Sequence, residues 1–348
     1  MGFFTVSWLD LNIRVQYDDE FDVLNFSKYY FEPWYDITEA NDTKTESFIV
    51  EIKNDTYKND ALHTLPSETI TMRGTKDPLW KITASKYASK NVCVYEINER
   101  NAFLTVEDKK TLRLYISKDD NYRGTIVYQE LFILIIDSLF IKYAESKGGL
   151  LFHAAAYGNE KEVCLIIGER GAGKTTTLLS AIRIAQNSCI ANDRCLLMPK
   201  DDTFLVYGLP YTINIRQESL SMFKDLNISN RHIPAKPKDK IVFQHKEIIS
   251  KNLKCGILKR ILLPNCIIPN ETRINRAIEE DAQTYLFDSC HSYKNVKFAD
   301  WHSLFKNEFS EEYKLSFIEN IVNRIPVFNL DWGKDLTTSF DLIVSMKN

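Results

Sequence analysis

Eight residues near the middle of the chain have the spacing of a phosphate-binding loop. Residues 168–175 read Gly-Glu-Arg-Gly-Ala-Gly-Lys-Thr and fit the P-loop pattern G-x-x-x-x-G-K-[ST]. In such a loop, backbone N–H groups turn inward and surround phosphate oxygens. Lys174 can reach the β- and γ-phosphates, and the Thr175 hydroxyl can bind Mg²⁺. The residues predicted to bind a nucleotide are Gly168, Glu169, Arg170, Gly171, Ala172, Gly173, Lys174, Thr175 and Thr176.

The residues on either side of this loop support the interpretation. Residues 163–167 form a continuous apolar run, as expected of a buried parallel strand. Residues 176–182 have helical spacing, so the loop is predicted to join a strand to a helix N-terminus, where anions are favoured. The alternative is a glycine-rich turn that only resembles a P-loop.

An acid and a histidine flank the loop in sequence. Asp193 follows the predicted helix, on the returning segment, where a carboxylate could hold Mg²⁺ or accept a proton from an attacking hydroxyl. His153 lies one predicted strand upstream and could orient that acid or contact the transferred phosphate. The alternatives are an ordinary turn aspartate and a hydrogen-bonded core histidine.

Basic residues provide a third feature. Phosphoryl transfer places negative charge on equatorial oxygens, and a nearby guanidinium or ammonium stabilises that charge. A basic loop at 229–240 could serve this purpose or could simply be a solvated surface segment. The candidates are Arg170, Arg194, Arg216, Lys236, Lys238 and Lys240.

The elements that must position these residues form a mixed α/β pattern. Residues 150–158 are predicted to be one strand before the P-loop strand. Residues 194–198 and 203–207 are separated by a Pro-Lys-Asp-Asp turn and predict a hairpin, so the sheet is not purely parallel. Further elements expected are a core strand at 257–264 and helices near 274–287 and 312–322.

The first third of the chain has a different character. Residues 1–121 consist mainly of strand-like segments separated by turns, and we interpret them as a β-rich domain for substrate docking or homo-oligomerisation. Residues 124–147 have helical spacing, so Asp137, which follows an apolar run, is assigned to a helix and given no role. A second domain, carrying the P-loop, is expected at 122–348.

Composition restricts the classes of partner. The 348 residues suit about two domains, and a net charge of −3 provides no overall basic field for nucleic acid. Seven scattered cysteines without a C-x-x-C pair predict reduced thiols, and the N-terminal residues are not expected to form a signal peptide. The most apolar stretch, 131–140, is too short to cross a membrane, so a cytoplasmic protein is expected.

Together these residues resemble the HPr kinase/phosphorylase superfamily, which is related to the P-loop phosphoenolpyruvate carboxykinases. The resemblance covers roughly residues 122–335 and rests on Phe152-His153-Ala154-Ala155-Ala156, the loop at 168–175 and Asn192-Asp193-Arg194. It implies a compact, mixed-sheet P-loop kinase domain.

The resemblance also implies ATP- and Mg²⁺-dependent phosphorylation of a serine hydroxyl on a peptide or small protein. In that activity Lys174 holds phosphate, Thr175 and Asp193 bind Mg²⁺, Asp193 is the base, and His153 supports it. The chain has Asn192 where the family commonly has Asp, and Thr176 where HPr-type enzymes have Glu. These departures favour a substrate other than HPr, such as the precursor of a modified peptide, as in lasso-peptide-tailoring kinases.

Two other functions remain open at this point. A kinase of the same fold could act on a small molecule, and a P-loop protein could be a nucleotide-dependent switch without a phosphate acceptor. The chain has no ABC-type Leu-Ser-Gly-Gly-Gln segment and no clear Walker B strand after the loop.

Overall fold

The computed structural model contains two compact units. It describes residues 1–39, 47–55, 67–73, 82–87, 92–97, 100–107, 109–119, 121–122, 125–183, 185–220, 223, 240–243, 245–265, 271–292, 304–305 and 310–333. The first unit comprises Met1–Ser146 with Tyr293–Glu308, and the second comprises Lys147–Ser292 with Phe309–Asn348. Within the described ranges, no helix has the length and apolar character needed to cross a membrane.

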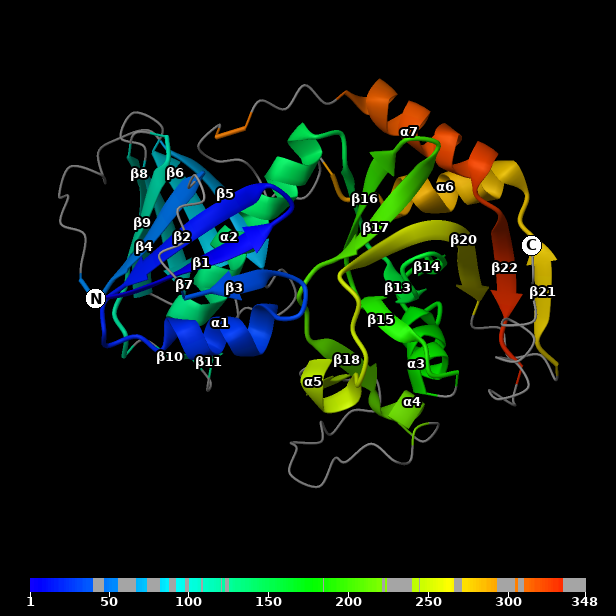
Figure 1. The fold of residues 1–348 in the computed structure, drawn as a ribbon, viewed down its shortest axis with the longest axis horizontal. Helices are drawn as coiled ribbons and strands as arrows, with labels where there is room; N and C mark the ends of the chain where they lie inside the picture. The colour runs from blue at the N-terminus through cyan, green and yellow to red at the C-terminus, as the bar shows by residue number, and fades with distance from the viewer. Residues whose placement is uncertain are drawn as a thin grey trace. The chain divides into compact units, whose positions relative to one another are not determined.

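The first unit is built on a nine-stranded sheet in the order β3-β1-β2-β4-β9-β8-β7-β6-β5 (Figure 1). Neighbouring strands are antiparallel except β2 with β4 and β4 with β9. The strands are β1 (Gly2–Trp8), β2 (Leu11–Tyr17), β3 (Asp36–Thr38), β4 (Phe48–Lys53), β5 (Glu68–Arg73), β6 (Ile82–Tyr87), β7 (Val92–Ile97), β8 (Arg100–Glu107) and β9 (Thr111–Tyr115). Within the described ranges, this part of the chain consists mainly of strands.

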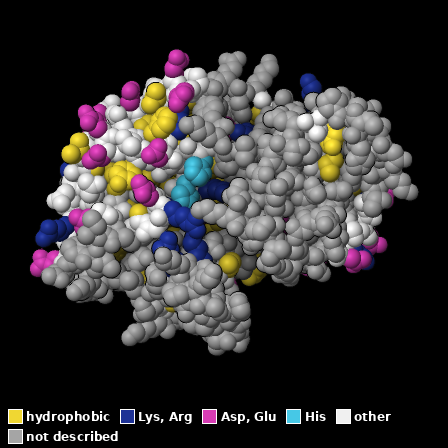
Figure 2. Space-filling view, turned by 180° about the vertical axis from the view of Figure 1, so that it is seen from behind, with side chains coloured by type: hydrophobic (Ala, Val, Ile, Leu, Met, Phe, Trp, Pro, Cys, Tyr) yellow, Lys and Arg dark blue, Asp and Glu magenta, His cyan; other side chains and the backbone are white. Residues whose placement is uncertain are grey.

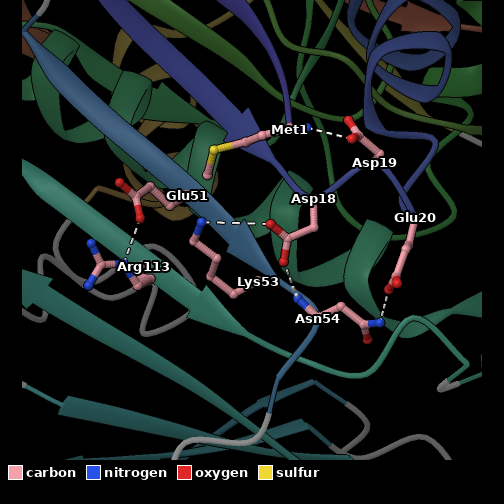
Figure 3. Close-up of polar contacts among 8 residues, drawn as sticks. All are labelled: Met1, Asp18, Asp19, Glu20, Glu51, Lys53, Asn54 and Arg113. Carbon is pink, nitrogen blue, oxygen red and sulfur yellow. Dashed lines mark hydrogen bonds and ion pairs between the residues drawn. The ribbon is translucent and has the colours of Figure 1, made fainter.

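Alternating burial explains why this sheet has one apolar face. In β2, Leu11, Ile13 and Val15 are buried, while the residues between them are more exposed. This period of two is expected of a strand with one face in a core. On its polar side, Arg113 of β9 lies 2.6 Å from Glu51 of β4, and Lys53 lies 3.7 Å from Asp18 (Figure 3).

Two helices pack within the first unit. They are α1 (Val23–Phe31) and α2 (Val127–Ser146), and a short hairpin, β10 (Asn121–Tyr122) with β11 (Thr125–Ile126), precedes α2. The ring of Phe132 lies 5.7 Å from Phe31, and that of Phe140 lies 4.5 Å from Tyr35. Because α2 packs in this way, the units divide after Ser146, whereas the sequence placed the boundary after residue 121.

The second unit contains a mixed sheet in the order β12-β16-β17-β20-β14-β13-β15, extended by β22 and β21. Only β14 with β20 and β20 with β22 are parallel pairs among its described strands. The strands are β12 (Leu150–Phe152), β13 (Ala155–Gly158), β14 (Val163–Ile166), β15 (Ser188–Ala191), β16 (Cys195–Lys200), β17 (Thr203–Gly208), β20 (Cys255–Asn265), β21 (Arg273–Arg276) and β22 (Val327–Asp331). The predicted hairpin is present as β16 and β17.

Helices cover both faces of this sheet, with α6 and α7 on one side and α3 on the other (Figure 1). The strand β14 is buried on both faces: Leu165 packs into the cluster with α6 and α7, and Ile166 packs into the cluster with α3. This explains the continuous apolar run before the P-loop. The remaining elements are α3 (Lys174–Arg183), β18 (Ile213–Arg216), α4 (Gln217–Leu220), β19 (Lys240–Phe243), α5 (His245–Ile248), α6 (Glu279–Ser289) and α7 (Glu311–Arg324).

Two predicted elements differ from the structure. Residues 150–158 form two strands and not one, with His153 and Ala154 between them outside any strand. The first strand, β12, pairs with β16, whereas the second, β13, pairs with β14 and β15. The helix predicted at 274–287 begins later, at Glu279, because Arg273–Arg276 pairs with β22 as strand β21. The helix predicted at 312–322 is present as α7.

Candidate active site

The P-loop joins β14 to α3, as the sequence predicts, and its backbone requires glycine. Gly171 and Gly173 have φ values of 96° and 103°, a region that residues with a side chain rarely adopt. A Cβ atom on Gly171 would lie 3.1 Å from a terminal nitrogen of Arg216. The Arg216 guanidinium therefore packs against the loop backbone and leaves little room for a side chain at position 171.

Lys174 is tied to the loop that precedes it. Its side chain is buried, and Nζ donates hydrogen bonds to the backbone oxygens of Gly168, at 2.6 Å, and Glu169, at 3.1 Å. Burial lowers the pKa of Lys174, and the carboxylate of Asp193 opposes that effect. The Asp193 carboxylate and the two carbonyl oxygens therefore favour the charged form of Lys174 beside the loop.

The first turn of α3 is fixed by buried hydroxyl contacts. The Thr177 hydroxyl donates to the Gly173 oxygen at 3.0 Å and accepts a hydrogen bond from the Trp332 indole at 2.9 Å. Thr175 and Thr176 are half-buried on this turn. The helix N-terminus therefore has a defined position at the end of the loop, where its free N–H groups favour an anion.

The sheet places His153 and Asp193 at the same edge as the P-loop. Strand β13 runs antiparallel to β14, with Ala155 opposite Ile166, so His153 lies where β14 enters the loop. Strand β15 runs antiparallel to β13, so Asp193, which follows β15, reaches the same edge. His153 Nδ1 and Asp193 Oδ1 are 3.5 Å apart, and 31% and 41% of these side chains are exposed. The pair is therefore accessible to a substrate.

The surroundings of the His153 ring favour its uncharged form. Burial is the largest cause of its lowered pKa, while the carboxylate of Asp193 raises the pKa and Lys174 and Arg194 lower it. An uncharged His153 leaves the negative charge of Asp193 available to accept a proton.

Cations surround the acid and the loop. The Arg194 Nε atom lies 3.7 Å from Asp193 Oδ2, and its guanidinium also donates to the Tyr211 hydroxyl at 2.9 Å. Figure 2 shows histidine side chains beside a group of lysine and arginine side chains. Such a field suits an anionic ligand.

The short hairpin of β18 and β19 contributes two of these cations. Arg216 lies opposite Lys240 in the pairing of the two strands. Burial lowers the pKa of Lys240, Asp193 raises it, and Arg170 and Arg216 lower it, so these charged groups interact. Two of the candidate lysines, Lys236 and Lys238, lie outside the described residues.

His291 was not identified from the sequence, although it contacts the site directly. Its ring is stacked on that of His153, with the centroids 5.4 Å apart and the planes 4° apart. A bridge between Phe152 and Cys290 and a hydrogen bond from the His291 N–H to the Leu151 oxygen bring it there. Because this contact depends on long-range pairing, no local pattern could have revealed it.

The residues available to bind Mg²⁺ fit a metal held mainly by phosphate. In the described ranges, no group of three or more His, Cys, Asp or Glu residues could hold a metal ion. Mg²⁺ bound with nucleotide phosphates needs only one or two protein ligands. The predicted ligands are Asp193 and Thr175. The buried Asn192 Oδ1 atom, which accepts no hydrogen bond from the described residues, provides another oxygen beside Asp193 in the sequence.

Comparisons with known proteins find distant similarity to solved structures. No family model matches the chain, and no curated protein matches it. Among solved structures, it is similar to the Hpr(Ser) kinase/phosphatase from Coxiella burnetii, with 11% identity over 56% of this chain and 93% of that chain and a TM-score of 0.28. At this TM-score we infer function from the site's own residues and not from the similarity.

Proposed function

We propose that the protein is an ATP- and Mg²⁺-dependent kinase that phosphorylates a serine hydroxyl of a peptide or small protein. One observation carries the proposal: the His153–Asp193 pair, with 3.5 Å between Nδ1 and Oδ1, lies at the same sheet edge as the P-loop. A nucleotide-binding loop needs such a base to direct transfer to a hydroxyl group.

On the donor side, each residue of the loop has a defined task. The backbone N–H groups of Glu169, Arg170, Gly171 and Gly173 and the N-terminus of α3 bind phosphate oxygens, while the Ala172 N–H donates to the Glu169 oxygen at 3.2 Å. Lys174, supported by the carbonyl oxygens of Gly168 and Glu169, places its charge beside the transferred phosphoryl group. Arg170, Arg216 and Lys240 add positive charge at the same loop. Thr175 and Asp193 would hold Mg²⁺, which offsets the charge of the phosphates when bound.

On the acceptor side, Asp193 accepts the proton of the serine hydroxyl as its oxygen bonds to the γ-phosphorus. The bond between that phosphorus and the β,γ-bridging oxygen breaks, and ADP leaves with the electron pair. His153 remains uncharged and orients the carboxylate. The partial exposure of both side chains leaves room for a peptide serine to approach.

The test is to incubate the full chain with Mg²⁺-ATP and a panel of serine-containing peptides, and to detect phosphorylated products by mass spectrometry. Lys174→Ala and Asp193→Asn should each greatly reduce phosphoryl transfer. For Asp193→Asn, which loses the general base, the rate should fall by about 10²–10⁴-fold. Asp202→Asn is the matched control, because Asp202 is a fully exposed turn aspartate in the same unit.

Four outcomes would contradict the proposal. Full activity of Asp193→Asn would exclude it as the base, and full activity of Lys174→Ala would exclude the loop as the donor site. Release of ADP and free phosphate with every acceptor unmodified would identify a nucleotide-dependent switch. Phosphorylation of a metabolite, and not of any peptide, would place the acceptor among small molecules.

A further inference from the structure

Trp332 reaches the P-loop edge of the second sheet because three strands run in the same direction. Strand β14, which leads into the loop, is parallel to β20, and β20 is parallel to β22 (Figure 1). The carboxyl ends of these strands therefore lie at one edge, and Trp332 directly follows β22 there. Its side chain is 5% exposed and belongs to the apolar cluster that also contains Ile166 and Leu178. The indole is thus buried beside the start of α3.

The backbone that carries this indole is anchored on both sides. Before Trp332, the last residue of β22, Asp331, pairs with Arg273 of β21. After it, the Gly333 N–H donates to the Thr272 hydroxyl at 2.9 Å, and a Cβ atom on Gly333 would lie only 2.6 Å from the Thr272 nitrogen. The indole therefore extends from tightly packed backbone and can hold a partner in place.

The polar end of the indole contacts the first turn of α3. Its Nε1–H donates a 2.9 Å hydrogen bond to the hydroxyl of Thr177, a residue with no exposed surface. An indole N–H can only donate, so the Thr177 oxygen must accept, and its own proton is directed to the Gly173 oxygen, 3.0 Å away. The Thr177 backbone N–H donates to the same oxygen at 2.9 Å. Two hydrogen bonds therefore hold the Gly173 carbonyl, and Trp332 fixes the direction of one of them.

The orientation of this carbonyl decides where the next N–H group points. Gly173 has a φ of 103°, and because glycine adopts positive and negative φ with similar ease, steric restriction alone does not select this conformation. In a planar trans peptide, the C=O of one residue and the N–H of the next point in opposite directions. With the Gly173 carbonyl directed along α3 to Thr177, the Lys174 N–H points out of the helix N-terminus. A phosphate oxygen binds in that direction.

We propose that Trp332 is a positioning residue for phosphate binding: acting through the Thr177 hydroxyl, it holds the Gly173 carbonyl so that the Lys174 N–H faces a bound phosphate. The proposal rests on the proposed function, because it takes the P-loop as the phosphate site. In this role Trp332 contacts no nucleotide and transfers no proton. An aromatic side chain without a donor N–H would keep the packing at this position and lose the orientation of the peptide.

The first experiment measures the dissociation constant of ADP for the full chain by isothermal titration calorimetry. Trp332→Phe keeps an aromatic ring without the donor, and Thr177→Val keeps the shape of the side chain without the hydroxyl. Each should weaken ADP binding by about threefold to tenfold, as expected for one hydrogen bond. The double variant should bind ADP no more weakly than Thr177→Val, because both changes act through the same hydroxyl. Thr177→Ser, which keeps that hydroxyl, should bind ADP like the wild type.

A matched control separates the orientation of the loop from the stability of the helix. Ser180 is buried on α3, and its hydroxyl donates to the Thr176 oxygen at 2.9 Å, the same type of contact as that of Thr177 with Gly173. Ser180→Ala should lower the melting temperature and leave the dissociation constant of ADP unchanged. If Trp332→Phe does not fold, Thr177→Val provides the same test, since it removes the acceptor of the indole hydrogen bond.

The second experiment follows the hydrogen bond itself by NMR. The chain has five tryptophans, and Trp332→Phe assigns the indole N–H signal of Trp332 in isotope-labelled protein by its disappearance. This signal should move upfield in Thr177→Val, where the indole loses its acceptor, and stay in place in Thr177→Ser and Ser180→Ala. ADP should shift the backbone amide signal of Lys174 in the wild type, and should shift it less in Thr177→Val.

The outcomes distinguish this inference from the proposed function. Wild-type affinity for ADP in both Trp332→Phe and Thr177→Val would overturn the inference and leave the kinase proposal standing. Equally weakened ADP binding in Ser180→Ala would also overturn it, because general destabilisation of α3 would then explain the loss. Absence of ADP binding by the wild type would overturn the inference together with the donor site. The expected ADP results without phosphorylation of any acceptor would support the inference and contradict the proposed function alone.

Discussion

Two aspartates, one in each unit, follow apolar runs in the sequence and end in opposite surroundings. Asp137 lies within α2 of the first unit, is 1% exposed, and accepts a hydrogen bond of 3.0 Å from the Tyr35 hydroxyl. Asp193 follows β15 of the second unit, has 41% of its side chain exposed, and lies beside the His153 ring and the charged Arg194 guanidinium. The Asp137 carboxylate is buried within the first unit, whereas the Asp193 carboxylate lies at the end of a strand and is partly exposed to solvent.

The same contrast extends to the cations of the two units. In the first unit, Arg113 and Lys53 each lie beside a carboxylate on the polar side of the sheet (Figure 3). In the second unit, Arg170, Arg216 and Lys240 act on one another across the P-loop. Like charges gathered in this way repel, so their arrangement is stabilised when an anion binds. The comparison indicates that the surroundings of an acid, more than the apolar run before it, distinguish the structural carboxylate of Asp137 from Asp193, the proposed base.

The largest effect expected is a difference between the two aspartates. Asp193→Asn should lower kcat by about 10²–10⁴-fold with little change in thermal stability, because its side chain is partly exposed. Asp137→Asn should leave kcat near the wild-type value and lower the free energy of unfolding by roughly 1–3 kcal/mol, since it alters a buried polar contact. Kinetics and denaturant melts of both variants check this. Equal effects on kcat would invalidate the comparison.

The next effect concerns two glycines with positive φ in the second unit. Gly171→Ala should raise the KM for ATP by about tenfold or more. An alanine at this positive φ would add strain of about 1–3 kcal/mol to the loop, and its Cβ atom would contact Arg216. Gly148→Ala is the control, since Gly148 has a φ of 86° and lies against Tyr313. It should lower the melting temperature and leave the KM unchanged. A raised KM in both variants would mean that general strain, not the loop, is being measured.

A smaller effect is expected for one cation at the loop. Lys240→Ala should raise the KM for ATP by about threefold to tenfold, equivalent to roughly 1 kcal/mol for a charge near phosphate, and added salt should reduce the difference. Lys251→Ala is the matched control, because Lys251 is an exposed lysine that precedes the bridge at the opposite end of β15. Steady-state kinetics at two salt concentrations check both variants. Identical responses would exclude Lys240 from the nucleotide site.

The smallest effect is a dependence of stability on pH. His153 and His291 both have lowered pKa values in the folded protein, so the unfolded chain binds more protons as pH falls below the ordinary histidine value. The contribution of the two histidines to the free energy of unfolding is therefore fully present above about pH 6.5. It is lost as the pH falls towards about 4, the pKa of His291. Thermal melts of the wild type and His291→Phe across this window should show a shallower loss in the variant. A steeper loss of stability with falling pH in His291→Phe would contradict the predicted direction of the pH dependence.

Local sequence patterns predicted the parts of the site that are continuous in the chain. The apolar run at 163–167 and the glycine spacing at 168–175 predicted β14, the loop and the start of α3, because both patterns reflect local backbone requirements. The position of Asp193 at the same sheet edge followed from the alternation of strand and helix.

The parts that depend on distant pairing could not be predicted in the same way. The break at His153 exists because β12 and β13 have different neighbouring strands, which the apolar run at 150–158 does not reveal. Strand β21 has the sequence pattern of the start of a helix, and it is a strand because it pairs with β22, which lies far along the chain. His291 reaches the site only through the Phe152–Cys290 bridge. The roles predicted for Lys174, Thr175, Asp193 and His153 stay predictions until the variants are measured.

The hydrogen bonds between Lys174 and its own loop have a thermodynamic consequence. Because Nζ already contacts the oxygens of Gly168 and Glu169, the side chain is ordered before any phosphate arrives. Immobilising a free lysine costs about 1.5–2 kcal/mol of rotamer entropy, and here folding has met much of that cost. Nucleotide binding should therefore proceed without a large entropic penalty at this residue, and the loop should keep its shape between successive turnovers.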